Sequence, residues 1–352
     1  MVTSAIPRPT RPVIRLKDPG TLLAALPYLL GFHPEDSVIL IGHRAPRPER
    51  IGLVLRADLP PPEHHADQAA QLAATLASSG DAGATIVVVG SHPASPPDGR
   101  PPHVELAEML REELFAAGLA VFHLMWVPEI SSGAPWQCYV DSECGGTLPD
   151  IESTVAAAAV TASGKVTHRS RAALERLLDP PDEVAIERRR ALLAEPPEYE
   201  DLTVDPTERG FAVVRAGLLL ADQRDLRLDD AQVVSLARAL ADPNVRDACL
   251  TTAVSPGSRT AKAAERLWLA LVQALPSPEY VDAACLLAYA AYVRGDGAFA
   301  RMAVERVRAT VPDCGLAELM LTALDHAYPP DQMALLGRLD GFPDLSLPED
   351  TS

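Results

Sequence analysis

The side chains best suited to chemistry gather in one short peptide and one predicted strand. Residues 31–37 read Gly-Phe-His-Pro-Glu-Asp-Ser and join a predicted helix to a predicted strand. If the strand that starts at Ser37 pairs as an antiparallel hairpin with the strand 51–59, Ser37 lies near Asp58 at one end of the sheet. Arg56 and Asp58 are two positions apart on one strand, so they share a face. Six side chains then surround one small volume: His33, Glu35, Asp36, Ser37, Arg56 and Asp58.

Two interpretations of this cluster are open. As a polar ligand site, Arg56 would face an anion, and His33 or the carboxylates would transfer protons. As a tight loop, the glycine ends the helix, the proline stiffens the turn and an aspartate caps backbone N–H groups. In that case Arg56 forms an ion pair with Asp36 or Asp58. The residue types fit both interpretations.

Other catalytic and metal-binding patterns are missing from the sequence. A triad of Ser37, His33 and Asp58 would lack the nucleophile elbow, because Gly-x-Ser-x-Gly occurs nowhere in the chain. Cys138 and Cys144 have no second cysteine pair to complete a zinc site, so we expect no bound metal. The glycine-rich loops that hold phosphate groups are also absent, and we expect no cofactor.

An α/β domain is predicted for residues 13–180. Leucines at helical spacing indicate a helix that opens at Asp18 and stops at Gly31, with Pro27 kinking or shortening it. Strands are predicted at 13–16, 37–41, 51–59, 85–89 and 121–127, with an edge strand at 136–140. Helical segments are predicted at 66–79, 104–117, 151–162 and 170–178. This alternation, with one hairpin, predicts a mixed sheet.

The second half of the chain is predicted to be an all-helical domain over residues 205–340. A charged helix between two proline pairs marks 181–204 as a linker, and residues 1–12 and 341–352 are expected to be flexible tails. Two helical hairpins resemble each other, since Ala264, Trp268, Leu271 and Pro276 recur in kind at Ala300, Val304, Val307 and Pro312. The spacing resembles a tetratricopeptide-type repeat. A generic helical bundle is the alternative, because Ala288 stands where that repeat prefers glycine.

Charge and composition exclude several classes of protein. The net charge is −17, and an acidic surface repels phosphate backbones, so we expect no nucleic-acid partner. No apolar run reaches the roughly 18 residues of a membrane span, and the N-terminus lacks the apolar core of a signal peptide. Five widely spaced cysteines do not make a disulfide framework. We therefore expect a cytoplasmic protein with reduced thiols.

Several motifs spread along the chain resemble a known family. They are Leu16-x-Asp18-Pro19, the block from Pro27 to Ser37 with its Gly-Phe-His-Pro core, Arg56-x-Asp58-Leu59, the region Trp136–Cys144, Ser170-Arg171, and Gly295-Asp296-Gly297-Ala298-x-Ala300. The chain resembles an actinobacterial family catalogued only as a domain of unknown function. The resemblance implies a lineage and a cytoplasmic setting, with no reaction or catalytic residue attached. Relatives carry more cysteines after Cys144, where this chain has Gly145-Gly146, and that difference weakens a metal or redox role for Cys138 and Cys144.

Two functional hypotheses follow from these patterns. The leading one is a non-enzymatic binding or adaptor protein that contacts another protein through its C-terminal helices. The alternative is a small-molecule-binding protein or enzyme with a polar site near His33, Ser37, Arg56 and Asp58, which would take a small anionic ligand. A deep polar pocket would favour the alternative, and a long concave helical face would favour the adaptor.

Overall fold

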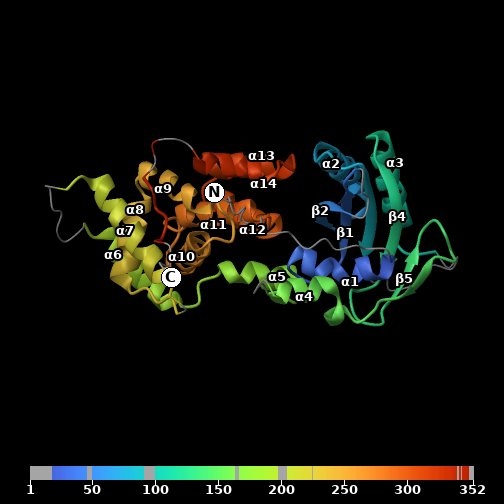
Figure 1. Cartoon of the computed structure of the whole chain (residues 1–352), viewed down its shortest axis with the longest axis horizontal. Coiled ribbons are helices and arrows are strands. Elements are labelled where there is room, and N and C mark those ends of the chain that lie inside the picture. Colours follow the sequence, from blue (N-terminus) through green and yellow to red (C-terminus); the bar gives the residue numbers. More distant parts are fainter. Residues whose placement is uncertain are drawn as a thin grey trace, which may run out of the picture. The chain divides into compact units, whose positions relative to one another are not determined.

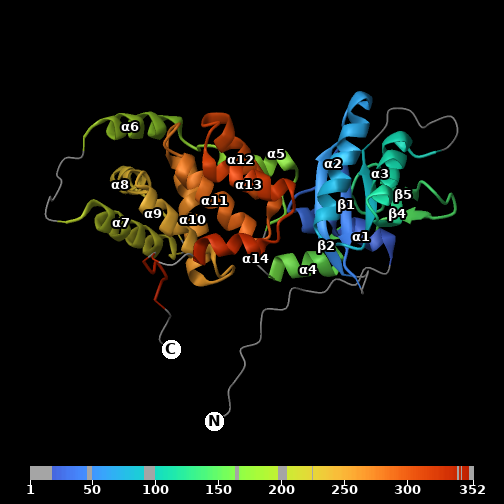
Figure 2. The ribbon, with the colours of Figure 1, turned by 90° about the horizontal axis from the view of Figure 1, so that it is seen from above.

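A computed structural model describes residues 18–45, 50–90, 100–162, 166–196, 204–223, 225–338, 341 and 343–348. The chain divides into two compact units, residues 1–171 and 172–352 (Figures 1 and 2). The predicted N-terminal tail 1–12 and the predicted strand 13–16 lie outside the described residues. The α/β first part and the helical second part confirm the predicted fold class.

The first unit contains a mixed six-stranded sheet with the strand order β2-β1-β3-β4-β5-β6. Its strands are β1 (Ser37–His43), β2 (Ile51–Asp58), β3 (Gly83–Val89), β4 (Ala120–Val127), β5 (Pro135–Cys138) and β6 (Gly145–Thr147). Only β3 and β4 pair in parallel, and the other neighbours are antiparallel. We predicted β5 as the edge strand, whereas the edge is β6, which the sequence did not reveal.

Two helices cover one face of this sheet. The 3₁₀ turn η1 (Pro62–His64) leads into α2 (His65–Ser78), and α3 (Val104–Ala116) connects β3 to β4. Figure 1 shows α2 and α3 beside the strands. Alternate residues of the strands point into the core beneath these helices, among them Val38, Leu40, Ala84, Ile86, Val88 and Leu124. The strand β3 is buried along its whole length, which fits a β-branched run that is apolar except for Thr85.

The helix α1 (Pro19–Leu30) crosses the opposite face of the sheet. A Cβ atom at Gly20 would lie 3.3 Å from the indole nitrogen of Trp136 on β5, and Phe32, just past the helix, packs under Arg56 of β2. The Asp18 side chain caps the first turn by accepting from the Thr21 N–H at 2.9 Å. The helix runs through Pro27 to Leu30, so the proline does not shorten it. The 3₁₀ turn η2 (Ile151–Ser153) leads into α4 (Val155–Ala162), which packs on α1.

The second unit is helical. We predicted no strand beyond residue 200, and past Thr147 the described part of the chain contains none. Its elements begin with α5 (Arg171–Glu175) and η3 (Arg176–Leu178) and continue with α6 (Glu183–Ala194), α7 (Pro206–Ala221), α8 (Asp230–Leu240), α9 (Pro243–Ala248), η4 (Cys249–Ala253), α10 (Arg259–Ala274), α11 (Val281–Arg294), α12 (Gly297–Thr310), α13 (Gly315–Asp325), α14 (Pro330–Met333) and η5 (Ala334–Arg338).

The helix α11 lies at the centre of this unit. Every residue from Ala283 to Val293 is buried, and α11 contacts α8, α10, α12, α13, α14 and η4. A helix that is apolar and buried all round belongs to the interior of a bundle. In a stack of repeated hairpins each helix keeps one exposed side. Of the two arrangements left open by the sequence, the burial of α11 therefore favours the generic bundle.

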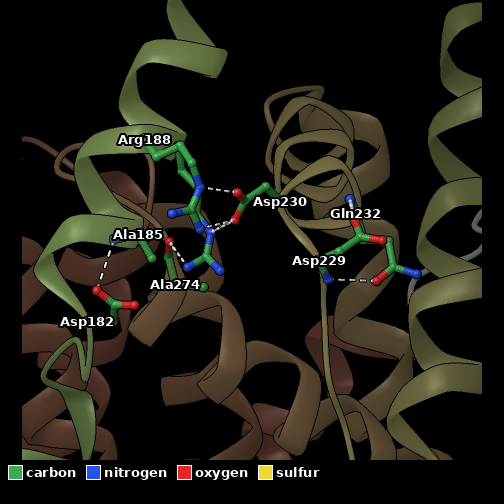
Figure 3. Close-up of polar contacts among 8 residues, drawn as sticks. Asp182, Ala185, Arg188, Asp229, Asp230, Gln232 and Ala274 are labelled. Carbon is green, nitrogen blue, oxygen red and sulfur yellow. Dashed lines mark hydrogen bonds and ion pairs between the residues drawn. The ribbon is translucent and has the colours of Figure 1, made fainter.

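The helix α6 is the charged helix that we placed in the linker 181–204, and it packs on α8. Its few buried residues, Ala185 and Ile186, offer little apolar surface. Polar contacts hold it instead. Arg188 binds the Asp230 carboxylate, as Figure 3 shows. Arg189 binds the same carboxylate through Nε at 2.8 Å. Arg189 also donates to the backbone oxygen of Ala274 at 3.0 Å. One aspartate thus joins two guanidinium groups between α6 and α8.

Part of the segment that we predicted as a C-terminal tail packs on the helices. Leu345 and Leu347 are buried. The Leu347 N–H donates to the Thr260 hydroxyl at 3.0 Å, and Arg259 donates to the Pro348 oxygen at 3.3 Å. Residues 345–348 are thus held on the helices by two buried apolar side chains and two hydrogen bonds.

Replacing Tyr289 with phenylalanine should lower the free energy of unfolding by about 1–3 kcal/mol. The buried Tyr289 hydroxyl donates to the Met333 oxygen and accepts from the Gly337 N–H, each at 3.1 Å, so the change removes a hydrogen-bond partner from two buried backbone groups. Urea unfolding measures the loss. Tyr328→Phe is the control, because Tyr328 is half-exposed, and an equal loss in both variants would contradict the assignment.

Candidate functional site

One edge of the sheet collects the ends of four strands. Ser37, the first residue of β1, pairs with Asp58 of β2 on one side and with Val89 of β3 on the other. Val89 in turn lies beside Val127, the last residue of β4. The carboxyl ends of β2, β3 and β4 therefore lie beside the amino end of β1. We call this end of the strands the carboxyl edge of the sheet. In open α/β sheets, ligands bind at the carboxyl ends of strands.

Arg56 is the central side chain of this edge. Because its neighbours Leu55 and Ala57 face the core beneath α2 and α3, Arg56 points to the face that α1 covers. Its Nε atom donates to the Ser37 hydroxyl at 2.8 Å, and Nη2 donates to the Glu35 backbone oxygen at 3.3 Å. Nη2 also lies 2.6 Å from the Asp58 carboxylate, and the side chain of Arg56 is only 12% exposed. Arg56 thus makes one ion pair and two hydrogen bonds.

Ser37 is buried and its hydroxyl is fully engaged. The Oγ atom donates its proton to the Glu35 backbone oxygen at 2.5 Å and accepts from Arg56 Nε. A hydroxyl whose proton is held by a carbonyl has no base to activate it. Within the described residues Ser37 therefore positions Arg56 and is not arranged as a nucleophile.

The loop before β1 fixes the remaining predicted residues. Gly31 has φ +81°, the left-handed conformation that ends α1. The His33 N–H donates to the His168 oxygen at 3.0 Å, so the backbone of His33 ties the loop to a distant segment. Asp36 also has positive φ, 37°, and its backbone oxygen accepts from the Leu59 N–H at 2.8 Å. This pairing extends the β1–β2 ladder by one step and leaves the Asp36 side chain exposed.

The predicted residues fall into two groups. The Arg56 side chain contacts the side chains of Ser37 and Asp58. Glu35 joins them through its backbone oxygen, whereas Asp36 and His33 take part through backbone hydrogen bonds of the loop. Asp58 is 76% exposed, and Glu35 and Asp36 of the adjoining loop are also exposed, while of these three carboxylates only that of Asp58 is seen to contact the Arg56 guanidinium.

Sequence analysis missed three side chains of this edge. The buried ring of Phe32 lies 5.9 Å from the Arg56 guanidinium carbon, a cation–π contact. Gln68 of α2 donates to the Asp58 backbone oxygen at 3.0 Å. The Trp126 indole donates to the Gly90 oxygen at 2.9 Å, just past β3. Phe32 lies within the motif 31–37, and its aromatic ring was the signal available for a contact with an arginine. Nothing in the sequence places Gln68 or Trp126 here.

A family model described as "Domain of unknown function (DUF4192)" matches residues 19–331. The chain belongs to the DUF4192 family. No curated protein and no solved structure matches this DUF4192 chain. The family match spans both units, so the sheet edge at Arg56 and the helices around α11 both lie within the DUF4192 region.

Metal ligands and membrane-spanning helices are both missing from the described part of the DUF4192 chain. No group of three or more histidine, cysteine or acidic side chains among these residues is arranged to hold a metal ion. Cys138 and Cys144 carry free thiols, linked by a backbone hydrogen bond of 2.9 Å across the β5–β6 turn. Over the same described ranges, none of the helices has both the length and the apolar character needed to cross a membrane.

Proposed function

We propose that this DUF4192 protein binds a small molecule at the carboxyl edge of its sheet, with the Arg56 guanidinium holding an anionic group of the ligand. The main support is that the two residues of the Arg56–Asp58 ion pair differ in their exposure to solvent. The Arg56 side chain is 12% exposed, whereas that of Asp58 is 76% exposed. A ligand carboxylate or phosphate can take the place of the solvated partner while Ser37 and Glu35 keep the guanidinium in position.

The charges at this edge indicate what else the ligand carries. Asp58, at the end of β2, and Glu35 and Asp36, in the loop before β1, are exposed, and the whole chain is acidic. A purely anionic molecule would be repelled by these carboxylates. A zwitterion that also bears an ammonium group matches both signs of charge, and amino acids are the simplest members of that class. We place this binding in the cytoplasm, as the composition suggests.

The proposal is binding and not catalysis. The Ser37 proton is held by the Glu35 oxygen, and His33 is tied to His168 by its backbone. Ser37 is therefore not arranged to transfer a proton to a group placed beside Arg56, and the contact seen for His33 is one of its backbone. Protein binding through the helical unit, our leading hypothesis from the sequence, depended on a concave face between stacked hairpins. The burial of α11 on all sides removes that argument, so the ligand site comes first.

The expected result of a thermal-shift screen is stabilisation by zwitterions that depends on Arg56. We expect wild type to be stabilised by one or more of the twenty amino acids, and less by phosphate or by a simple alkylamine. A free ligand at about 100 times its Kd adds about 2.7 kcal/mol of stability. Arg56→Gln should lose the shift, because the guanidinium that holds the ligand anion is gone.

Arg44→Gln is the matched control. Arg44 follows β1 at the other end of the sheet, where it lies 3.8 Å from Asp81, and its side chain is 67% exposed. Its removal changes the net charge as Arg56→Gln does, but should leave the ligand-induced shift intact. The proposal fails if no amino acid stabilises the wild type and Arg56→Gln only lowers the stability of the fold. Arg56 would then have a structural role alone. Arg56→Lys covers the case in which Arg56→Gln does not fold.

A further inference from the structure

Two cysteines that are distant in sequence meet inside the second unit. Cys285 lies on the central helix α11, and Cys314 is the residue that caps the start of α13. Their Sγ atoms are 3.7 Å apart. Cys285 is 1% exposed, whereas Cys314 is half-buried, so solvent reaches the pair from the side of Cys314. This juxtaposition is independent of the ligand edge around Arg56.

The surroundings make the two thiols unequal. A hydrogen bond from the Cys285 thiol lowers the pKa of Cys314 to about 6, and the backbone N–H groups of Leu316 and Ala317 act in the same direction. These are the N–H groups that a side chain at the capping position can reach. Burial and the charge of Asp282 oppose the effect. The lowered pKa favours the thiolate form of Cys314 over that of Cys285.

Cys285 is the partner that keeps its proton. Its hydrogen bond to Cys314 raises the pKa of the Cys285 thiol, and burial and the nearby thiolate add to the rise. The charge of Asp282, one turn earlier on α11, also raises the pKa of Cys285, while the charge of Arg246 lowers it. The pair thus consists of one accessible thiolate and one buried thiol in contact, which is the arrangement of an attacking and a resolving cysteine.

We propose that Cys314 and Cys285 form a peroxide-sensitive thiol pair that closes into a disulfide between α13 and α11. The Cys314 thiolate attacks one oxygen of a hydroperoxide such as hydrogen peroxide, the O–O bond breaks, and the leaving hydroxide takes a proton to become water. Cys314 is now a sulfenic acid. The Cys285 thiol attacks its sulfur, the S–O bond breaks, and a second water leaves with the thiol proton. Two thiols are oxidised and one peroxide is reduced.

Disulfide formation needs a modest movement at the start of α13. An S–S bond is about 2.05 Å long, so the two sulfur atoms must approach by less than about 2 Å. The far end of α13 is already tied to α11, because the Tyr292 hydroxyl contacts the Ala323 and Tyr328 oxygens at 3.1 and 2.8 Å. The disulfide would fix the other end. Oxidation thus adds a covalent link to α11 at the start of α13.

The test uses the full chain with Cys138→Ser and Cys144→Ser, which remove the second pair of thiols. Cys249 stays, since it is buried and its pKa is raised by that burial. Treatment with hydrogen peroxide should join the peptides containing residues 285 and 314, as seen by mass spectrometry, and should raise the Tm. With Cys285→Ala the reaction should stop at a sulfenic acid on Cys314, trapped by dimedone. Cys314→Ser should abolish both products and still fold, because serine is a favoured capping residue.

Alkylation rates give a second readout. Near pH 6, Cys314 should react with iodoacetamide about tenfold faster than an unperturbed thiol, after allowance for the weaker nucleophilicity of a low-pKa thiolate. Cys285→Ala should move the midpoint of the rate profile of Cys314 upward, because the hydrogen-bond donor is gone. A midpoint above about 8 in the parent protein, or peroxide treatment that yields no linkage between residues 285 and 314, would overturn the proposal.

Discussion

Replacing Gly52 with alanine should lower the free energy of unfolding of the first unit by about 3 kcal/mol. A Cβ atom at Gly52 would lie 1.9 Å from the Oδ1 atom of Asp81, far inside van der Waals contact. The carboxylate cannot move aside cheaply, because Asp81 Oδ2 accepts from the Leu53 N–H at 2.9 Å and from the Ser79 hydroxyl at 2.8 Å. Urea unfolding followed by circular dichroism measures the loss.

The matched controls separate the clash from a general effect of alanine. Gly42→Ala should cost a similar amount, since its Cβ atom would lie 2.1 Å from Asp81 Oδ2. Gly315→Ala has no neighbour within 4 Å and should be close to neutral. Adding Asp81→Ala to Gly52→Ala should give a double variant more stable than the sum of the single losses predicts. A loss below about 1 kcal/mol for Gly52→Ala would show that the strands shift to make room.

The same contact explains where the sequence analysis ended β1 too early. We predicted that the strand ends at Ile41 and that a hairpin loop begins at Gly42, because residues 42–50 contain two prolines, whereas β1 continues to His43. The glycines at 42 and 52 are there because the Asp81 carboxylate fills the space that their side chains would need. A glycine inside a strand pattern is a signal of close approach. The identity of the approaching residue depends on tertiary structure, so the sequence could not supply it.

The strand β6 was missed for a related reason. Its sequence Gly145–Thr147 has almost no intrinsic preference for a strand. It pairs with β5 because Gly146 lies against the Trp136 indole, where a Cβ atom would approach Nε1 to 3.2 Å. Packing on a neighbouring aromatic side chain thus outweighs local propensity. By contrast, the β-branched run of β3 and the apolar run of β1 were predicted correctly because both are core strands.

For the candidate site, the two-residue period of a β-strand was the main basis of the prediction. Alternation along β2 placed Arg56 and Asp58 on one face, and the hairpin register placed them beside Ser37. The loop 31–36 has no such period, so the directions of His33 and Asp36 could not be derived. The positive φ of Asp36 and the bridge between Phe32 and His168 arise from long-range contacts. Whether a ligand occupies this edge stays a prediction.

Replacing Asp230 with asparagine should lower the free energy of unfolding of the second unit by about 2 kcal/mol, between two measured limits. Removing one partner of a fully buried ion pair costs about 3–5 kcal/mol, and exposed pairs contribute about 0–1 kcal/mol. Asp230 is 24% exposed and Arg189 is 14% exposed, so this cluster lies between the two limits. Arg189→Met should cost more than Arg188→Met, because Arg188 is 53% exposed. Urea unfolding of the three variants gives the ranking.

The effect of Asp230 should depend on pH in a defined direction. The hydrogen bond from Arg188, aided by Arg189 and opposed by burial, lowers the pKa of Asp230 to about 2, whereas an aspartate in an unfolded chain titrates near 3.9. A depressed folded-state pKa means that the contribution is complete above about pH 4 and disappears as the pH falls through about 2. The amide that replaces the carboxylate in Asp230→Asn does not titrate. The stability difference between wild type and this variant should therefore be constant from about pH 5 to 7 and shrink between about pH 4 and 2. A difference that stays constant down to about pH 2 would mean that the two arginines do not hold α6 through this charge.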